Sequence, residues 1–223
     1  FRDWSRADGV RTDEHTRIHF KSRIVGYFTF AANYAVHGFG TAGYHAVNTA
    51  IHVLNGLLVY WLTALILGTP FLAPPARGPA VARYLPAAAA VLFVCHPVQT
   101  QAVTYIVQRF TSLATLFFLI ACVLYLTARL SARRFTAVTA YLGALTASLL
   151  AMKTKEIAFT LPLVVALYEF LFFEGPAGRR ILALLPLLFL WGLLGVRRAD
   201  AAGRGKRILA FIGAFFVGAV GAV

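Results

Sequence analysis

Long apolar runs separated by short polar segments dominate the chain from about residue 44 onward. Most of these runs are long enough for a helix to cross the roughly 30 Å hydrocarbon core of a bilayer. The pattern predicts an all-α polytopic membrane bundle of about six or seven transmembrane helices with interfacial helices. The predicted spans are 44–67, 84–96, 111–128, 135–152, 157–173 and 181–196, with a seventh that starts near residue 208.

Two stretches interrupt this pattern. Residues 19–37 are aromatic and only mildly apolar, which is typical of an amphipathic helix that lies at a membrane interface. Pro97 ends the second predicted span at His96, because the residue before a proline is disfavoured in a helix. The polar residues that follow predict a second, short interfacial helix over 98–108.

The chain therefore divides into two parts. Residues 1–43 are interpreted as an outer-face segment with the first interfacial helix, and residues 44–223 as a multi-span transmembrane domain. The basic residues are spread over the loops on both sides, so the positive-inside rule does not settle the orientation. We expect the chain to be part of a longer protein.

Composition agrees with the apolar pattern. Hydrophobic residues make up 60% of the 223 residues and charged residues 13%, whereas a soluble domain is about half apolar and about a quarter charged. The net charge of +13 fits basic residues that flank spans and face anionic headgroups. We expect an integral, multi-pass protein of a bacterial inner membrane, with membrane lipids as partners and no nucleic acid.

The first predicted span carries a polar stripe. His45, Asn48, His52 and Asn55 follow one another at intervals of three and four residues and so share one face of a helix. Two interpretations stay open, because such groups either bond neighbouring helices or line a polar cavity. We expect no metal site, since no acidic or cysteine ligand accompanies the histidines.

Cations and amides are predicted to gather at one end of the bundle. The segment "HPVQTQAVTYIVQR" supplies His96, Gln101 and Arg109, and "MKTKEIAF" supplies the rest between two later spans. Cationic side chains beside a lipid surface can hold a phosphate, although snorkelling side chains give the same pattern. The predicted phosphate ligands are Arg109, Lys153 and Lys155, and the predicted cavity residues are His45, Asn48, His52, His96, Gln101 and Glu156.

These same residues carry a resemblance to a known family. "GYHAVNTAIHVLNGLLVY", "HPVQTQAVTYIVQR" and "KTKEIAFTLPLVVALYE" resemble the membrane half of C-type glycosyltransferases, above all the transmembrane, tetratricopeptide-repeat O-mannosyltransferase-like proteins. The resemblance covers about residues 20–170. It implies an enzyme that moves a sugar from a polyprenyl-phosphate donor to a protein or lipid acceptor on the outer face. The lipid-linked sugar is then a substrate, and no cofactor is expected.

The resemblance leaves the catalytic acid unidentified. In the family it lies in a loop after a first span, and we expect that span, like the family's repeats, to lie outside this chain. Asp13 and Glu14 are the candidates within it. Two alternatives stay open, namely a non-catalytic scaffold subunit of a larger membrane complex and a lipid or sugar transporter.

Overall fold

The computed structural model describes residues 23–72 and 78–201, and all regular elements in this part of the chain are helices. Short 3₁₀ turns join some of them, namely η2 Pro97–Gln99, η3 Ile106–Gln108 and η4 Glu156–Thr160. The helices are α2 Ile24–His37, α3 Thr41–Leu67, α4 Pro79–Cys95, α5 Thr100–Thr104, α6 Arg109–Leu130, α7 Arg134–Met152, α8 Leu161–Phe172 and α9 Ala177–Ala201.

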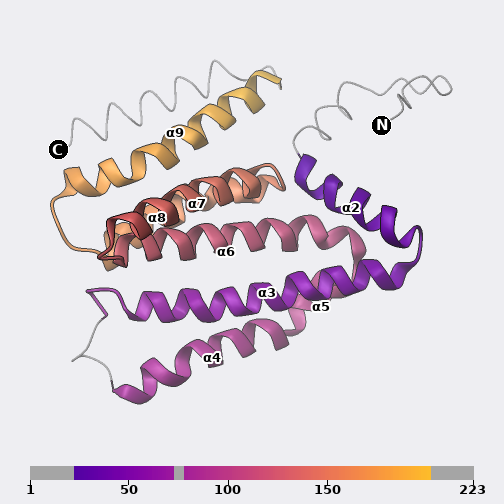
Figure 1. Cartoon of the computed structure of the whole chain (residues 1–223), viewed down its shortest axis with the longest axis horizontal. Coiled ribbons are helices and arrows are strands. Elements are labelled where there is room, and N and C mark those ends of the chain that lie inside the picture. The colour runs from indigo at the N-terminus through magenta and orange to yellow at the C-terminus, as the bar shows by residue number, and fades with distance from the viewer. Residues whose placement is uncertain (1–22, 73–77, 202–223) are drawn as a thin grey trace.

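The long helices run back and forth side by side (Figure 1). Helix α3 packs against α4 on one side and α6 on the other, and α6 also packs extensively against α7. We name the two ends of this bundle after residues that lie there. The Arg109 end holds the starts of α3, α6 and α8 and the ends of α4 and α7, and α2 lies across it, whereas the Arg134 end holds their opposite termini.

Small side chains let the central helices approach closely. Ala114 and Ala121 of α6 and Ala144, Ala147 and Ala151 of α7 are all buried. Helices packed in a membrane use small residues in this way, because lipid tails provide no hydrophobic drive and association depends on close contact. The core of the bundle therefore lies along α6 and α7, with α8 against them.

Large apolar side chains cover the outside of the bundle. Leu57 of α3, Leu92 of α4 and Leu163 of α8 are more than half exposed, as expected of surfaces that face lipid rather than water. Three helices of the described residues are long and apolar enough to cross a membrane, or four if α4 and the bent segment after it form one span. The prediction of an all-helical membrane bundle is confirmed.

The predicted number of six or seven spans is not confirmed. Helix α8 has only 12 residues, and the apolar part of α9 is also shorter than the three long helices. The fifth and sixth predicted spans therefore do not meet the length criterion that the first, third and fourth meet. The seventh predicted span lies outside the described residues.

The predicted single helix over 98–108 is wrong in detail. The segment bends by 51° after α4 and consists of η2, α5 and η3, with an extended residue, Tyr105, between the last two. Four β-branched residues and one aromatic residue weaken the helix there, namely Val103, Thr104, Tyr105, Ile106 and Val107. Gln101 and Gln108 therefore do not share a continuous helical face.

A buried ion pair joins α6 to α8 near the Arg134 end. Glu169 is fully buried, and Arg129 donates two hydrogen bonds to its carboxylate, from Nε at 2.8 Å and from Nη2 at 2.6 Å. The Tyr125 hydroxyl donates a third at 2.7 Å, and the guanidinium lies 4.8 Å from the centre of the Phe173 ring. A bidentate, further bonded pair of this kind is what allows a carboxylate to be buried.

We expect the Arg129–Glu169 pair to couple α6 and α8 energetically. Glu169→Leu should lower the free energy of unfolding by about 1–3 kcal/mol, because it leaves a half-buried guanidinium without its anion. The double variant Arg129→Leu with Glu169→Leu should recover part of that loss, since no unpaired charge remains. Thermal unfolding in detergent measures both, and losses that simply add would contradict the coupling.

Candidate functional site at the Arg109 end

Arg109, the first residue of α6, is fully buried where three helices meet. Its Nε donates to Asn48 Oδ1 of α3 at 2.7 Å, and its Nη2 donates to Asn33 Oδ1 of α2 at 2.8 Å. The backbone carbonyls of Tyr44 and Thr29 accept further bonds at 3.0 and 3.4 Å. One guanidinium thus ties α2, α3 and α6 together.

Aromatic rings complete the enclosure of Arg109. Its guanidinium carbon lies 4.5 Å from the ring centre of Phe30 and 5.4 Å from that of Tyr44. Arginine can be buried in this manner because its planar cation accepts aromatic faces and forked hydrogen bonds at the same time. Four of the five N–H donors are occupied within the protein.

The polar stripe of α3 bonds the backbone of the bent segment and of the helices on either side of it, α4 and α6. His45 Nδ1 lies 3.2 Å from the carbonyl oxygen of residue 103, and Asn48 Nδ2 lies 3.4 Å from that of residue 106. His52 Nε2 lies 3.1 Å from the carbonyl oxygen of residue 94, and Asn55 Nδ2 lies 3.0 Å from that of residue 112. All four therefore bond one helix to another, as the first of the two interpretations describes.

These bonds provide partners for backbone carbonyls at the bend after α4. A carbonyl cannot donate, so His45 carries its proton on Nδ1 and His52 on Nε2. Where a helix breaks at membrane depth, its freed carbonyls require such partners. The stripe stabilises the break after α4, and a role for His45, Asn48 and His52 in shaping a sugar cavity stays a prediction.

His96 closes the end of α4 as expected. Its backbone is extended before Pro97, and its Nδ1 accepts a hydrogen bond from the backbone N–H of Val98 at 3.2 Å. The side chains of His96 and Gln101 are both exposed at the Arg109 end. Both are accessible to a ligand, and their predicted role stays a prediction.

Lys155 is the cation that reaches α6 from the later helices. It follows α7, and its Nζ donates to the Thr111 hydroxyl at 2.5 Å. That hydroxyl in turn donates to Gln108 Oε1 at 2.8 Å. Lys153, which caps α7 two residues earlier, is also half-buried. The predicted lysines therefore lie at the same end of the bundle as Arg109.

Arg109 and Lys155 do not approach the same face of α6. Positions 109 and 111 are separated by about 200° around a helix, and Arg109 extends toward α2 and α3 while Lys155 bonds Thr111. The geometry gives no support to one phosphate pocket shared by both. In this arrangement Arg109 stabilises the end of the bundle, and the lysines with Thr111 and Gln108 form what we call the Lys155 cluster.

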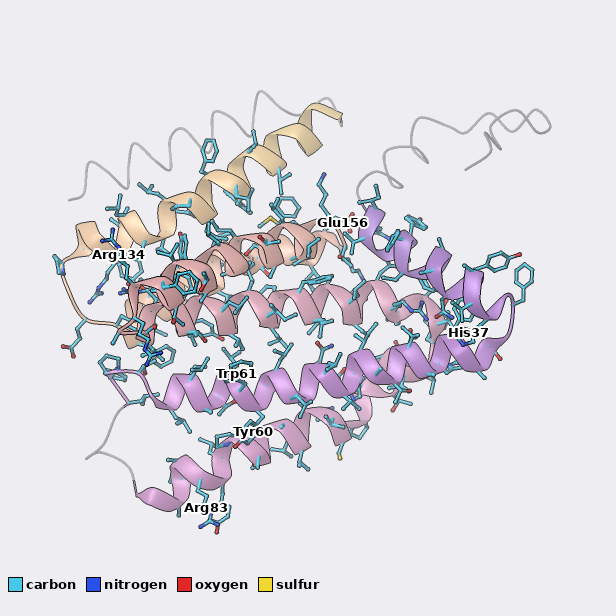
Figure 2. The ribbon with its side chains drawn as sticks, viewed as in Figure 1. His37, Tyr60, Trp61, Arg83, Arg134 and Glu156 are labelled. Carbon is cyan, nitrogen blue, oxygen red and sulfur yellow. The ribbon has the colours of Figure 1, made fainter. Side chains whose placement is uncertain are left out.

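An ion pair lies next to the Lys155 cluster. Glu156, at the start of η4, accepts two hydrogen bonds from Arg23, the residue before α2, at 3.0 Å from Nη2 and 3.4 Å from Nε. The Arg23 guanidinium lies 5.9 Å from the ring centre of Phe110. In Figure 2, Glu156 lies beside the start of α2. The predicted cavity residue Glu156 thus contacts the residue that precedes α2.

Four residues of these networks were missed by the sequence patterns. Asn33 is a single amide in an aromatic and apolar run, Thr111 lies beside Ser112 at the start of an apolar run, and Arg23 belongs to a basic group without a distinct spacing. Glu169 had a usable signal, because an acidic residue inside an apolar run is costly unless it is paired. Its partner, 40 residues earlier, could be found only from the packing.

Some sequence predictions fall outside the described residues. The candidate catalytic residues Asp13 and Glu14 belong to the part of the chain whose placement is not described. Among residues 23–72 and 78–201, no three histidine, cysteine, aspartate or glutamate side chains are placed to hold a metal ion. The described residues of this end supply hydrogen-bonding groups, several cations and the carboxylate of Glu156.

The fold and the Arg109 end define an all-helical membrane protein with a basic, amide-bearing end. The chain is similar to protein O-mannosyl-transferase TMTC2 of Homo sapiens, with 28% identity over 199 residues, and to that of Mus musculus, with 29% over 200 residues. It is also similar to protein O-mannosyl-transferase F38B6.6 of Caenorhabditis elegans, with 31% identity over 121 residues. These matches confirm the resemblance to O-mannosyltransferase-like proteins.

The matches cover the chain and its relatives unequally. They span 82% of this chain for the two TMTC2 proteins and 52% for F38B6.6, but only 22% and 15% of the relatives. The chain thus spans about a fifth of the length of its relatives or less. No family model and no solved structure matches it. The relatives named are animal proteins, which give no support to the predicted bacterial inner membrane.

We expect Arg109 to be required mainly for stability. Arg109→Met should lower the free energy of unfolding by at least about 3 kcal/mol, because it leaves two amide oxygens and two carbonyls without their donor. Arg109→Lys should fall between this variant and the wild type, since one ammonium cannot match the planar fork.

Arg133→Ala is the matched control for this prediction. Arg133 is exposed at the Arg134 end, so its loss should change stability by no more than about 0.5 kcal/mol. Thermal unfolding in detergent compares the three variants. Similar unfolding temperatures for Arg109→Met and Arg133→Ala would show that the buried network has little energetic value.

Proposed function

We propose that the chain is the membrane part of a glycosyltransferase that moves a sugar from a polyprenyl-phosphate donor to a protein acceptor on the outer membrane face. The observation that carries the proposal is the Lys155 cluster, a cation with a hydroxyl and an amide at a membrane-embedded helix end. It occurs in a chain that is similar to proteins named protein O-mannosyl-transferases. Mannose is therefore the first donor sugar to test, and a lipid acceptor is the alternative to a protein.

The chemistry assigns the cluster to the leaving group. When the bond between the sugar and the phosphate breaks, negative charge develops on the phosphate, and cations placed beside it lower the barrier. Lys155 has three N–H donors, and among the described residues Thr111 accepts one of them. The remaining donors, with Lys153, can hold phosphate oxygens. Arg109 supports this arrangement by fixing the start of α6.

The acceptor hydroxyl needs a carboxylate as general base. We propose Asp13 or Glu14 for this role, and experiment must decide between the two. Glu156 is engaged by Arg23, so we do not assign it to the base. His45, His96 and Gln101 are proposed to contact the sugar from the same end.

The hydrogen bonds of Arg109 within the protein are also compatible with a second candidate function. Arg109 makes four hydrogen bonds within the protein. Such a buried cation suits a scaffold subunit of a larger membrane complex as well as it suits an enzyme. Turnover separates the two candidates. Absence of transfer by the full-length wild-type protein from every polyprenyl-phosphate sugar offered would favour the scaffold.

We expect Lys155→Ala to weaken use of the donor. Loss of one charge-assisted contact should weaken donor affinity by about 1.5–3 kcal/mol, or roughly ten- to a hundredfold. The measurement is transfer from a labelled polyprenyl-phosphate sugar by the full-length protein in reconstituted membranes. Arg133→Ala, at the opposite end, should leave the apparent donor affinity unchanged. Equal affinities for the two variants would remove the Lys155 cluster from the donor site.

A further inference from the structure

Arg23 brings a further cation to the edge of the Lys155 cluster. Arg23 contacts Glu156 and the Phe110 ring. The next residues in the chain on either side form the other contact, since Lys155 precedes Glu156 and bonds Thr111, which follows Phe110. The ammonium of Lys155 and the guanidinium of Arg23 therefore approach neighbouring positions at the start of α6. The two cations come from segments more than a hundred residues apart.

We propose that Arg23 is an additional ligand for the phosphate that Lys155 binds, and that Glu156 occupies its guanidinium while the site holds no anion. This inference rests on the proposed function and names a further binding residue of the same site. The ligand chemistry is a phosphate group, carried either by the polyprenyl lipid or by a free anion.

The geometry of the ion pair supports the exchange. Arg23 presents Nε and Nη2 to two oxygens of one carboxylate, and the same fork fits two oxygens of a phosphate. The side chains of Arg23 and Glu156 are 30% and 46% exposed. An ion pair this accessible contributes little to stability, so a phosphate that is already held by Lys155 can replace the carboxylate.

The exchange would also replace one attachment of the start of α2, the Arg23–Glu156 pair, by another. The middle of α2 is fixed to α3 and α6 through Asn33 and Arg109, whereas Arg23 precedes its first turn. A phosphate bridging Arg23 and Lys155 would join the start of α2 to the end of α7. Substrate binding and the position of α2 are therefore linked in this proposal.

Binding of a sugar-free polyprenyl monophosphate tests the inference separately from transfer. The full-length protein is placed in phosphatidylcholine nanodiscs, and affinity is measured for the wild type and for Arg23→Gln, Glu156→Gln and the double variant. Arg23→Gln should bind roughly tenfold more weakly. Glu156→Gln should bind a few-fold more tightly, because Arg23 no longer has a competing anion.

The double variant gives the decisive comparison. If Glu156 acts by holding Arg23, the double variant should bind as weakly as Arg23→Gln alone, because there is no guanidinium left to release. If the gain from Glu156→Gln persists without Arg23, the carboxylate acts only as a nearby charge and the inference is wrong. Arg134→Gln, at the opposite end in Figure 2, should bind like the wild type.

Further binding measurements distinguish a lipid phosphate from a free phosphate, and failure of this inference from failure of the proposed function. Arg23→Lys keeps the charge but loses the fork, so its affinity should fall between those of Arg23→Gln and the wild type, which distinguishes lost binding from lost folding. Displacement of the lipid by millimolar inorganic phosphate would assign the site to a free anion. Binding that depends on Lys155 but not on Arg23 would overturn this inference and leave the proposed function standing. No binding by the wild type would overturn both.

Discussion

The arrangement of the Arg109 end depends on the burial of one guanidinium. A cation removed from water is stable only if nearly all its donors are bonded and its charge is compensated by dipoles or rings. Arg109 meets this condition with two asparagine oxygens, two backbone carbonyls and two aromatic faces. These partners lie on α2 and α3, so the start of α6 and the position of α2 are fixed together.

The bent segment between α4 and α6 follows the same rule. Its breaks at Pro97 and Tyr105 free backbone groups, and the stripe on α3 supplies donors at the matching heights. The result is an internally bonded end at which exposed and half-buried groups, chiefly the Lys155 cluster and His96, are held in place. Rigid support of exposed polar groups is what a binding site in a membrane requires.

The sequence predicted the helices well where the apolar runs are long, and it predicted the end of α4 from Pro97 because proline acts locally. It also placed Arg109, Lys153 and Lys155 at one end, since helices that alternate in direction bring those turns together. It could not predict that Arg109 turns inward, because its partners Asn33 and Thr29 belong to a helix some 80 residues earlier. Glu169 shows the same limit, since its partner is set by packing rather than by spacing.

The central claim is that Arg109 holds the protein together while the lysines bind the donor. An experimental structure of the full-length protein in lipid nanodiscs with a polyprenyl phosphate tests it most directly. The account predicts phosphate density within hydrogen-bond distance of Lys155 Nζ, with Arg109 still bonded to Asn33 and Asn48. Density bound by an Arg109 side chain that has left those two asparagines would contradict it, as would a phosphate bound at the Arg134 end.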